Sequence, residues 1–216
     1  MTTPAILLRD VTKRYEAFAL GPLQLTLPAG LALGLQGPNG SGKSTLFRLL
    51  ANLVRRDGGQ IEVCGHSVEA NRWEFKEDLA LVSEDLGLYP AASIQWHLDL
   101  GRSFYSAWDA TRAEDYLRRF ELSPHQPTRG LSRGQRLKLL FTLALAHRPK
   151  VLLLDEATAG LDEASRIEMR RHLRQLVQAE GLTVLISSHL REDIELVADE
   201  VMCIEQGKLV HAEVAA

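Results

Sequence analysis

A glycine-rich segment places the strongest constraint on how this 216-residue chain can fold. It matches the pattern G-x-x-x-x-G-K-[ST] of a phosphate-binding P-loop at every fixed position. An apolar run typical of a strand, residues 31–36, precedes it. Leucines at helical spacing follow it, namely Leu46, Leu49, Leu50 and Leu53. The segment itself consists of Gly37, Pro38, Asn39, Gly40, Ser41, Gly42, Lys43, Ser44 and Thr45.

A strand that leads through a glycine loop into a helix is the geometry that a polyphosphate requires. Glycines let backbone N–H groups turn toward the anion, and the helix N-terminus adds partial positive charge. We expect Lys43 to reach the β- and γ-phosphates and the Ser44 hydroxyl to coordinate Mg²⁺. The alternative, a glycine-rich turn that binds nothing, is disfavoured by the strand before the loop and the helix after it.

Composition and charge limit the class of protein. Apolar residues make up 45% of the chain and charged residues 25%, which predicts a globular protein with a substantial core. The length fits one large domain or two small lobes. A formal net charge of −3 argues against a surface built to bind nucleic acid or anionic lipid.

The cysteines and the apolar runs bear on the cellular compartment. Cys64 and Cys203 lie in strand-like runs, and we interpret both as small buried hydrophobic residues in a reducing compartment. The apolar run at residues 139–146 is too short to span a bilayer. Residues 1–4 lack the pattern of a signal peptide. A role at a membrane would therefore require a partner.

The pattern of elements changes along the chain. Strand-like runs occur at residues 6–11, 23–27, 60–64 and 79–83, whereas residues 93–145 carry hardly any β signal. In that stretch Ser93 and Asp109 are placed to cap helices, the first bearing Ile94, Leu98 and Tyr105, and residues 137–146 form another. We predict an α/β fold, a P-loop NTPase core with a mixed sheet and an inserted helical subdomain. Its core lobe would comprise residues 1–89 and 147–216, and its helical subdomain residues 90–146.

Charged residues follow the ends of several predicted strands in the core. The apolar strand at residues 151–154 ends in Asp155 and Glu156, Glu84 follows residues 79–83, and His189 follows residues 183–187. Ligands of open α/β sheets bind at the carboxyl ends of the strands, so these groups are expected to converge on the P-loop. Each alone would be an ordinary loop charge. Gly181 is expected to end the helix between these strands, and Gln206-Gly207 to form a hairpin turn before residues 209–212.

One further segment resembles a family signature. Leu131-Ser132-Arg133-Gly134-Gln135 is similar to the LSGGQ motif of ATP-binding-cassette (ABC) ATPases. Other family elements occur in order, with residues 37–45 as Walker A and residues 151–155 as Walker B. Residues 159–162 resemble the D-loop, and His189 the switch histidine. Tyr15, by itself either a loop aromatic or a base-stacking platform, occupies the adenine-stacking position.

The resemblance implies an ATPase that requires ATP and Mg²⁺. It makes Glu156 the catalytic base, with Lys43 and His189 also in the catalytic set. Ser44, Glu84 and Asp155 would surround the metal. The signature residues Ser132, Gly134 and Gln135 would contact the ATP of a facing subunit. That arrangement is a head-to-tail dimer, either a homodimer or a heterodimer with a related ATPase.

Two residues depart from the family pattern. Glu84 stands where glutamine is usual, and a carboxylate there keeps the ability to approach Mg²⁺ but loses the amide donor. Arg133 replaces the first glycine of the signature pair. If that position needs positive φ or close backbone approach, arginine is costly; if not, its guanidinium is available to supplement the γ-phosphate contact.

The resemblance also implies a partner and a place in the cell. Residues 88–90, 104–105 and 108–109 resemble stand-alone ATPases of bacterial multidrug and antibiotic exporters. We therefore expect the chain to drive a separate transmembrane permease, an exporter, from the cytoplasmic face of the cell membrane. Two rivals remain: a soluble ABC ATPase acting on DNA or ribosomes, and a nucleotide-dependent regulator without hydrolysis. The first is disfavoured because this sequence shows neither the long coiled coil nor the second cassette that such ATPases carry. The second is disfavoured because Glu156 is intact.

Overall fold

The computed structural model describes residues 3–69 and 73–211, which form two β-sheets and the helices around them. An antiparallel sheet has the strand order β2-β1-β4-β5. A six-stranded sheet has the order β10-β9-β3-β8-β7-β6, in which only β10 runs antiparallel to its neighbour. The strands of the first sheet are β1 (Ile6–Tyr15), β2 (Phe18–Leu27), β4 (Gly58–Val63) and β5 (His66–Ser67). Those of the second are β3 (Ala32–Gln36), β6 (Leu79–Ser83), β7 (Val151–Asp155), β8 (Thr183–Ser187), β9 (Glu200–Glu205) and β10 (Lys208–His211).

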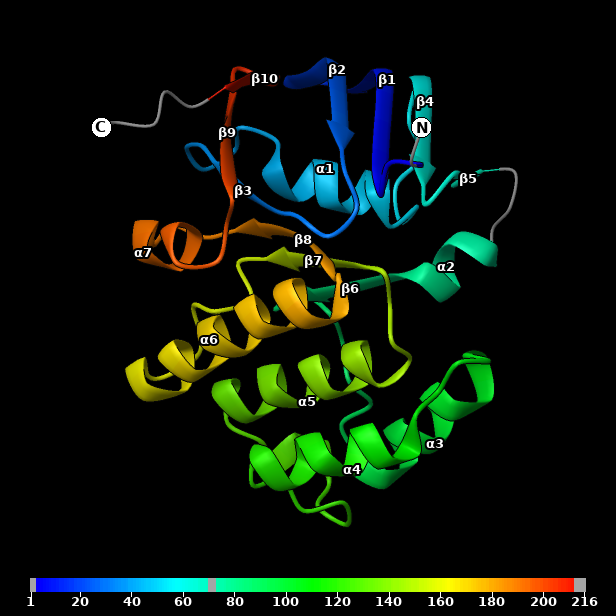
Figure 1. Ribbon diagram of the computed structural model, residues 1–216, viewed down its shortest axis with the longest axis vertical. Coiled ribbons are helices and arrows are strands. Elements are labelled where there is room, and N and C mark those ends of the chain that lie inside the picture. The colour runs from blue at the N-terminus through cyan, green and yellow to red at the C-terminus, as the bar shows by residue number, and fades with distance from the viewer. Residues whose placement is uncertain (1–2, 70–72, 212–216) are drawn as a thin grey trace.

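The six-stranded sheet is buried on both faces. Along β7, Leu152 and Leu154 pack into one core with helices α5 (Arg133–Ala146) and α6 (Glu163–Glu180), while Val151 and Leu153 pack into another with α1 (Lys43–Leu50). Successive side chains of a strand point to opposite faces, so a strand between two cores is apolar throughout. Figure 1 shows α1 between the two sheets, with α5 and α6 on the opposite face of the larger one. The sheet therefore holds α1 and the ends of β7 and β8 in one fixed frame.

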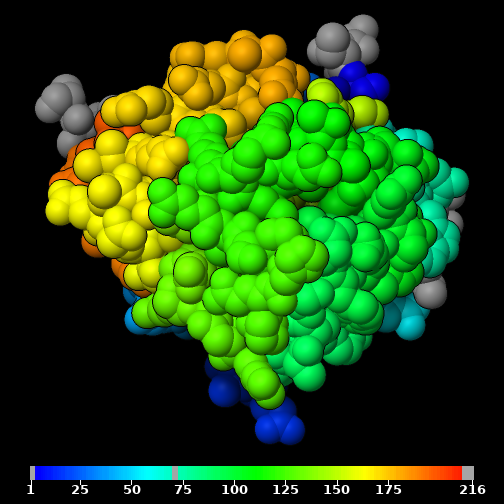
Figure 2. Space-filling view, turned by 90° about the horizontal axis from the view of Figure 1, so that it is seen from below, coloured from blue at the N-terminus to red at the C-terminus, as the bar shows by residue number. Residues whose placement is uncertain are grey.

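Helices α3 (Ile94–Phe104) and α4 (Ala110–Arg119) lie at the end of the molecule that Figure 2 shows, and both contact α5. The predicted caps are confirmed: Ser93 Oγ accepts from the Trp96 N–H at 3.1 Å, and Asp109 Oδ1 from the Arg112 N–H at 2.9 Å. The shorter helical elements are α2 (Glu74–Asp78), the 3₁₀ turn η1 (Thr128–Gly130) and α7 (Arg191–Glu195). The mixed sheet with its P-loop helix agrees with the predicted fold class. The boundaries 90–146 for a separate helical subdomain stay a prediction.

Both chain reversals predicted near the C-terminal strands are present. Gly181 follows α6 with φ 69°, in the left-handed conformation that commonly ends a helix. Gln206 and Gly207 have φ of 49° and 77° and connect β9 to β10. Within residues 3–69 and 73–211, no helix is long and apolar enough to cross a membrane. Ala212 of the last predicted strand and residues 1–2 of the N-terminal segment lie outside the described residues.

Three expectations about individual side chains were wrong. Helix α1 ends at Leu50, and Asn52 then adopts φ 53°, so Leu53 leaves the predicted apolar face and is 59% exposed. Tyr105 lies beyond the last residue of α3, in extended backbone, and its ring stacks on His147 with centroids 3.9 Å apart. Cys64 and Cys203 are free thiols and are half-buried rather than buried. Burial still raises the pKa of the Cys64 thiol to about 11.

Candidate functional site

A cleft of about 390 Å³ opens where the P-loop meets the β1–β2 turn and the carboxyl ends of β7 and β8. Its volume falls within the range of small-molecule sites. It brings together most of the predicted nucleotide residues from distant parts of the chain. The lining comprises Tyr15, Ala17, Phe18, Asn39, Gly40, Gly42, Lys43, Ser44, Thr45, Glu156 and His189.

The P-loop backbone can be built only with glycine at two of its positions. Gly42 has φ 111°, and a Cβ there would lie 2.6 Å from Leu20 Cδ1 and 2.9 Å from Phe18 Cζ. Gly37 has φ 148°, and its Cβ would lie 2.5 Å from the Ile204 carbonyl oxygen. Gly42 is also the residue that caps α1, so the loop directs the N-terminus of α1 at the cleft. The predicted strand–loop–helix arrangement is therefore present.

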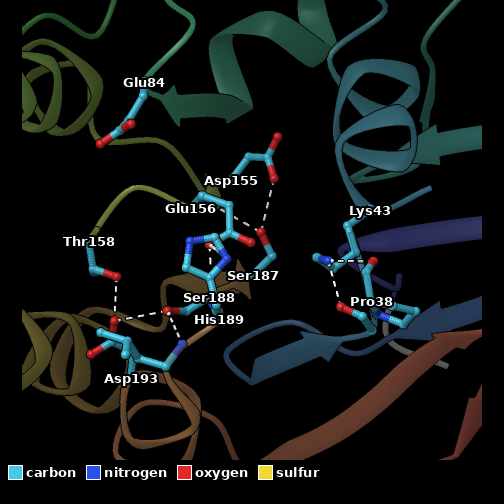
Figure 3. Close-up of polar contacts among 12 residues, drawn as sticks. Pro38, Lys43, Glu84, Asp155, Glu156, Thr158, Ser187, Ser188, His189 and Asp193 are labelled. Carbon is cyan, nitrogen blue, oxygen red and sulfur yellow. Dashed lines mark hydrogen bonds and ion pairs between the residues drawn. The ribbon is translucent and has the colours of Figure 1, made fainter. Parts of the chain in front are cut away.

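Polar groups of the P-loop suit an anionic ligand. The buried Lys43 ammonium donates to the carbonyl oxygens of Gly37 at 2.7 Å and Pro38 at 3.1 Å, as Figure 3 shows. An ammonium has three hydrogens, so these two bonds leave it capacity for another acceptor. The Ser41 hydroxyl is buried and has no hydrogen-bond partner among the described residues. Buried polar groups are normally satisfied, so this pattern fits a phosphate that accepts from the loop.

Glu156 and His189 meet beyond the ends of β7 and β8 (Figure 3). His189 Nδ1 lies 3.0 Å from Glu156 Oε2, and the His189 backbone N–H donates to the same oxygen at 3.2 Å. Glu156 has φ 54°, a left-handed conformation that is uncommon for glutamate. Its own N–H lies 3.2 Å from the Ser187 carbonyl oxygen. Such backbone strain gathers at functional sites, where the surrounding structure holds it in place.

The surroundings of Glu156 make it a better proton acceptor. Burial raises the pKa of its carboxyl above the ordinary value, and this effect outweighs the opposing attraction of His189 and Lys43. The neighbouring Asp155 raises the pKa further. A carboxylate with a raised pKa is a stronger base once ionised. The geometry and the pKa shift therefore both suit proton abstraction from a water molecule.

Oxygen atoms suited to Mg²⁺ lie beside the P-loop. Asp155 is buried at the end of β7, and its Oδ1 accepts from the Ser187 hydroxyl at 2.9 Å. Ser44 is half-buried in the first turn of α1. A carboxylate and a hydroxyl are hard oxygen ligands of the kind that Mg²⁺ prefers, and Mg²⁺ usually takes the rest from phosphates and water. In the part of the chain that the structure describes, no group of three or more His, Cys, Asp and Glu side chains could hold a metal by itself.

The two departures from the family pattern bind each other. Arg133 Nε donates to Glu84 Oε1 at 2.7 Å, and its terminal nitrogen lies 2.5 Å from Oε2. Gly160 makes room for the pair, since a Cβ there would lie 2.7 Å from Arg133 Cγ and 2.9 Å from Glu84 Oε1. Figure 3 shows the Glu84 carboxylate pointing away from Asp155. The metal role of Glu84 stays a prediction, and a metal there would have to compete with this ion pair.

The signature residues do not line the cleft. Ser132 Oγ accepts from the Gln135 N–H at 3.2 Å, and Gln135 Oε1 accepts from the Ser132 N–H at 3.0 Å. This reciprocal capping box satisfies two N–H groups at the start of α5. Gly134 lies in the same turn, where a Cβ would come within 3.2 Å of the Gly160 carbonyl oxygen. Any contact of these residues with ATP would therefore be to a ligand outside this cleft.

Tyr15 lies at the mouth of the cleft and is 47% exposed. The Lys13 ammonium lies 5.4 Å from its ring centroid and is itself held by Asp57 at 3.1 Å. Sequence reasoning missed Phe18, which faces Tyr15 across the β1–β2 turn and packs against the Gly42 position. Its position three residues after Tyr15, a candidate stacking residue, was the available signal.

The fold and the cleft define an α/β nucleotide-binding protein of the P-loop class. The profile of the family described as ABC transporter matches residues 20–159. The chain therefore belongs to the ABC transporter family, as its ATP-binding component.

The relatives of this chain include proteins named for drug resistance and for import. It is 34% identical to the daunorubicin resistance ATP-binding protein DrrA3 of Streptomyces coeruleorubidus, over 97% of this chain and 68% of the relative. It is 35% identical to the aliphatic sulfonates import ATP-binding protein SsuB 2 of Agrobacterium fabrum, over 87% of this chain and 71% of the relative. The chain thus spans about two thirds of the length of these proteins.

A solved structure has the same fold. The dimeric ATP-binding cassette MJ0796, in a post-hydrolysis state bound to ADP and Pi, superimposes with a TM-score of 0.87 at 22% identity. The match covers 96% of this chain and 97% of that chain. At this identity the likeness concerns the fold.

Proposed function

We propose that this chain hydrolyses ATP in the P-loop cleft and thereby drives a separate membrane permease, acting as an exporter. The observation that carries the proposal is the meeting of a strained, half-buried Glu156 with His189 opposite the Lys43 ammonium. Glu156 takes the proton of the attacking water, and His189 contacts the γ-phosphate. Lys43 turns from the Gly37 and Pro38 carbonyls to the β- and γ-phosphates.

The other site residues bind the nucleotide and its metal. Ser44 and Asp155 would hold Mg²⁺, and Glu84 would be able to approach it or its water only after release from Arg133. The metal neutralises charge that develops on the phosphates during transfer. Tyr15 stacks on adenine, and the remaining P-loop residues other than Pro38 present backbone N–H groups to the phosphates. A phosphate-release assay separates this function from that of a regulator without hydrolysis.

The direction of transport is proposed from the relatives of this chain. Similarity to a daunorubicin resistance protein supports export, and similarity to a sulfonate import protein supports the opposite. The permease contact is proposed for a groove of about 280 Å³ whose lining includes Leu81 and Leu86, on either side of Glu84 in the sequence. Exposed aromatic rings stand at or near it, namely Tyr89, Trp96 and Phe104. Through this contact the chain would sit on the cytoplasmic face of the cell membrane, without nucleic acid as a partner.

We further propose that two copies, or one copy and a related ATPase, close head to tail around ATP. The N-terminus of α5, with Ser132, Gly134 and Gln135, would face the ATP in the other subunit's cleft. The helix dipole and the N–H groups of the first turn that the capping box does not use, such as that of Gly134, favour an anion there. This explains why these residues lie outside their own cleft.

Dimer formation can be read by size-exclusion chromatography with light scattering. The nucleotide-free chain should be monomeric, and Glu156→Gln should bind ATP with Mg²⁺, fail to activate water and accumulate as a dimer. Adding Ser132→Arg should abolish the dimer and leave the ATP affinity of the monomer nearly unchanged. Because Ser132→Arg also removes a helix cap, Ser93→Arg is the matched control, and its dimer should persist. A persistent dimer in the Ser132→Arg variant would exclude the signature as part of the interface.

A further inference from the structure

A buried carboxylate that belongs to none of the sequence motifs lies beneath Glu156 and His189, the proposed catalytic pair. Asp193, in the short helix α7, is 0% exposed. Its Oδ2 accepts from the Thr158 hydroxyl at 2.5 Å and from the Ser188 hydroxyl at 2.9 Å (Figure 3). Its Oδ1 lies 3.3 Å from Nε of the buried Arg170. Burying a carboxylate is costly unless it is paired and hydrogen-bonded, so this network needs an explanation.

The two hydroxyls belong to the two segments that carry the catalytic pair. Ser188 directly precedes His189, and its oxygen also accepts from the Leu190 N–H at 3.1 Å, so it fixes the chain on both sides of the histidine. Thr158 follows Glu156 by two residues, in a turn where the Ala159 N–H donates to the Glu156 carbonyl at 3.3 Å. The Asp193 carboxylate therefore joins the turn after β7 to the turn after β8.

The catalytic contact depends on how those turns are placed. Glu156 Oε2 contacts His189 Nδ1 and accepts a hydrogen bond from the His189 backbone N–H. Neither Glu156 nor His189 lies inside a regular strand or helix. Misplacing a reacting group by about 1 Å can cost on the order of 100-fold in rate. Asp193 and Thr158 do not line the nucleotide cleft. A disturbance at Asp193 would therefore reach the reaction through alignment rather than through ATP binding.

We propose that Asp193 is a positioning residue for ATP hydrolysis, which holds the Glu156 and His189 turns in register through the Thr158 and Ser188 hydroxyls. The inference rests on the proposed roles of Glu156 and His189. Arg170 supplies the opposite charge that makes a buried carboxylate tolerable at this point. Thr158 also immediately precedes residues 159–162, which resemble the D-loop.

Removing one hydroxyl at a time tests the proposal without unpairing Arg170. Thr158→Val and Ser188→Ala should each lower kcat by about 5- to 100-fold while KM for ATP stays within about twofold, because the cleft is unchanged. Thr158→Ser keeps the donor and should retain most of the wild-type kcat. Asp193→Asn, which can accept through one oxygen only, should lower kcat at least as much.

The matched control is Thr142→Val. Thr142 is fully buried in α5, and its hydroxyl donates to the Lys138 carbonyl at 2.9 Å, away from the cleft. This variant loses the same group and should keep kcat within about twofold. All variants are assayed well below their melting temperatures, with the folded fraction checked by circular dichroism.

The outcomes separate this inference from the function on which it rests. An inactive wild-type chain would overturn the hydrolysis proposal itself. An active wild type with unchanged kcat in both Thr158→Val and Ser188→Ala would overturn only the role of Asp193. A Thr158→Ser variant as slow as Thr158→Val would also overturn it, since the hydroxyl would then not be the group that matters.

Discussion

Tyr15 offers the most direct test of how the cleft binds its nucleotide. The ring is 47% exposed, and the Lys13 ammonium lies 5.4 Å from its centroid. Lys13 is held in turn by Asp57, so the ring is supported from the protein and open toward the cleft. Stacking of a base on an aromatic side chain contributes about 1–3 kcal/mol by alanine substitution. An exposed ring belongs in the lower part of that range, so Tyr15→Ala should cost about 1–2 kcal/mol, or roughly 5- to 30-fold in Kd.

The assay is isothermal titration of ATP against four proteins. Tyr15→Phe and Tyr15→Trp keep a π-face and should bind within about threefold of wild type, whereas Tyr15→Ala should not. Inorganic tripolyphosphate lacks a base, so its affinity should be equal in all four. Phe104→Ala, which removes another exposed ring, is the matched control and should bind ATP normally. Equal losses in the Ala, Phe and Trp variants, or equal losses for tripolyphosphate, would refute stacking.

Three further predictions concern the charged groups. Lys43→Ala should weaken ATP binding by about 10- to 150-fold, the value of a hydrogen bond to a charged group, and unchanged affinity by titration would contradict the P-loop assignment. Because burial raises the pKa of Glu156 and only the ionised form accepts a proton, kcat should fall as pH decreases, starting above the range of an ordinary glutamate. A pH–rate profile that stays flat into that ordinary range would refute this. Glu84→Gln should retain basal hydrolysis within about twofold, because glutamine is the family residue at this position. Loss of phosphate release in this variant would give Glu84 a catalytic role. In a double-mutant cycle, the effects of Glu84→Gln and Arg133→Gly on dimer formation should be non-additive.

The sequence predicted those parts of the fold in which local and long-range signals agree. Residues 151–154 are apolar without alternation, and β7 is buried on both faces. Ser93 and Asp109 cap helices because short polar side chains at those positions can satisfy a free N–H. The prediction that Leu53 lies on the apolar face of α1 was wrong, because a spacing rule cannot show where a helix stops. Asn52 adopts a left-handed conformation after α1 and ends it before Leu53.

The cleft was predictable to the extent that its groups follow strand ends or a fixed motif. Glu156 and His189 follow the carboxyl ends of β7 and β8, which are neighbouring parallel strands, so the topology alone brings the two residues together. Asp193 and Thr158 carry no such signal. Their contact depends on where the five-residue helix α7 packs after β8, and neither periodicity nor composition specifies that position.

The Glu84–Arg133 pair changes how the two departures from the family should be understood. Taken separately, one adds a negative charge near the metal and the other places a large cation in the signature. In the structure each cancels the other, and Gly160 leaves the space that both side chains need. Restoring one family residue alone leaves the other charge without its partner. Arg133→Gly by itself should therefore change ATP-driven dimerisation more than the double variant Glu84→Gln/Arg133→Gly, in which both positions return to the family residues. A change in the double variant equal to the sum of the two single changes would show that the two residues act independently.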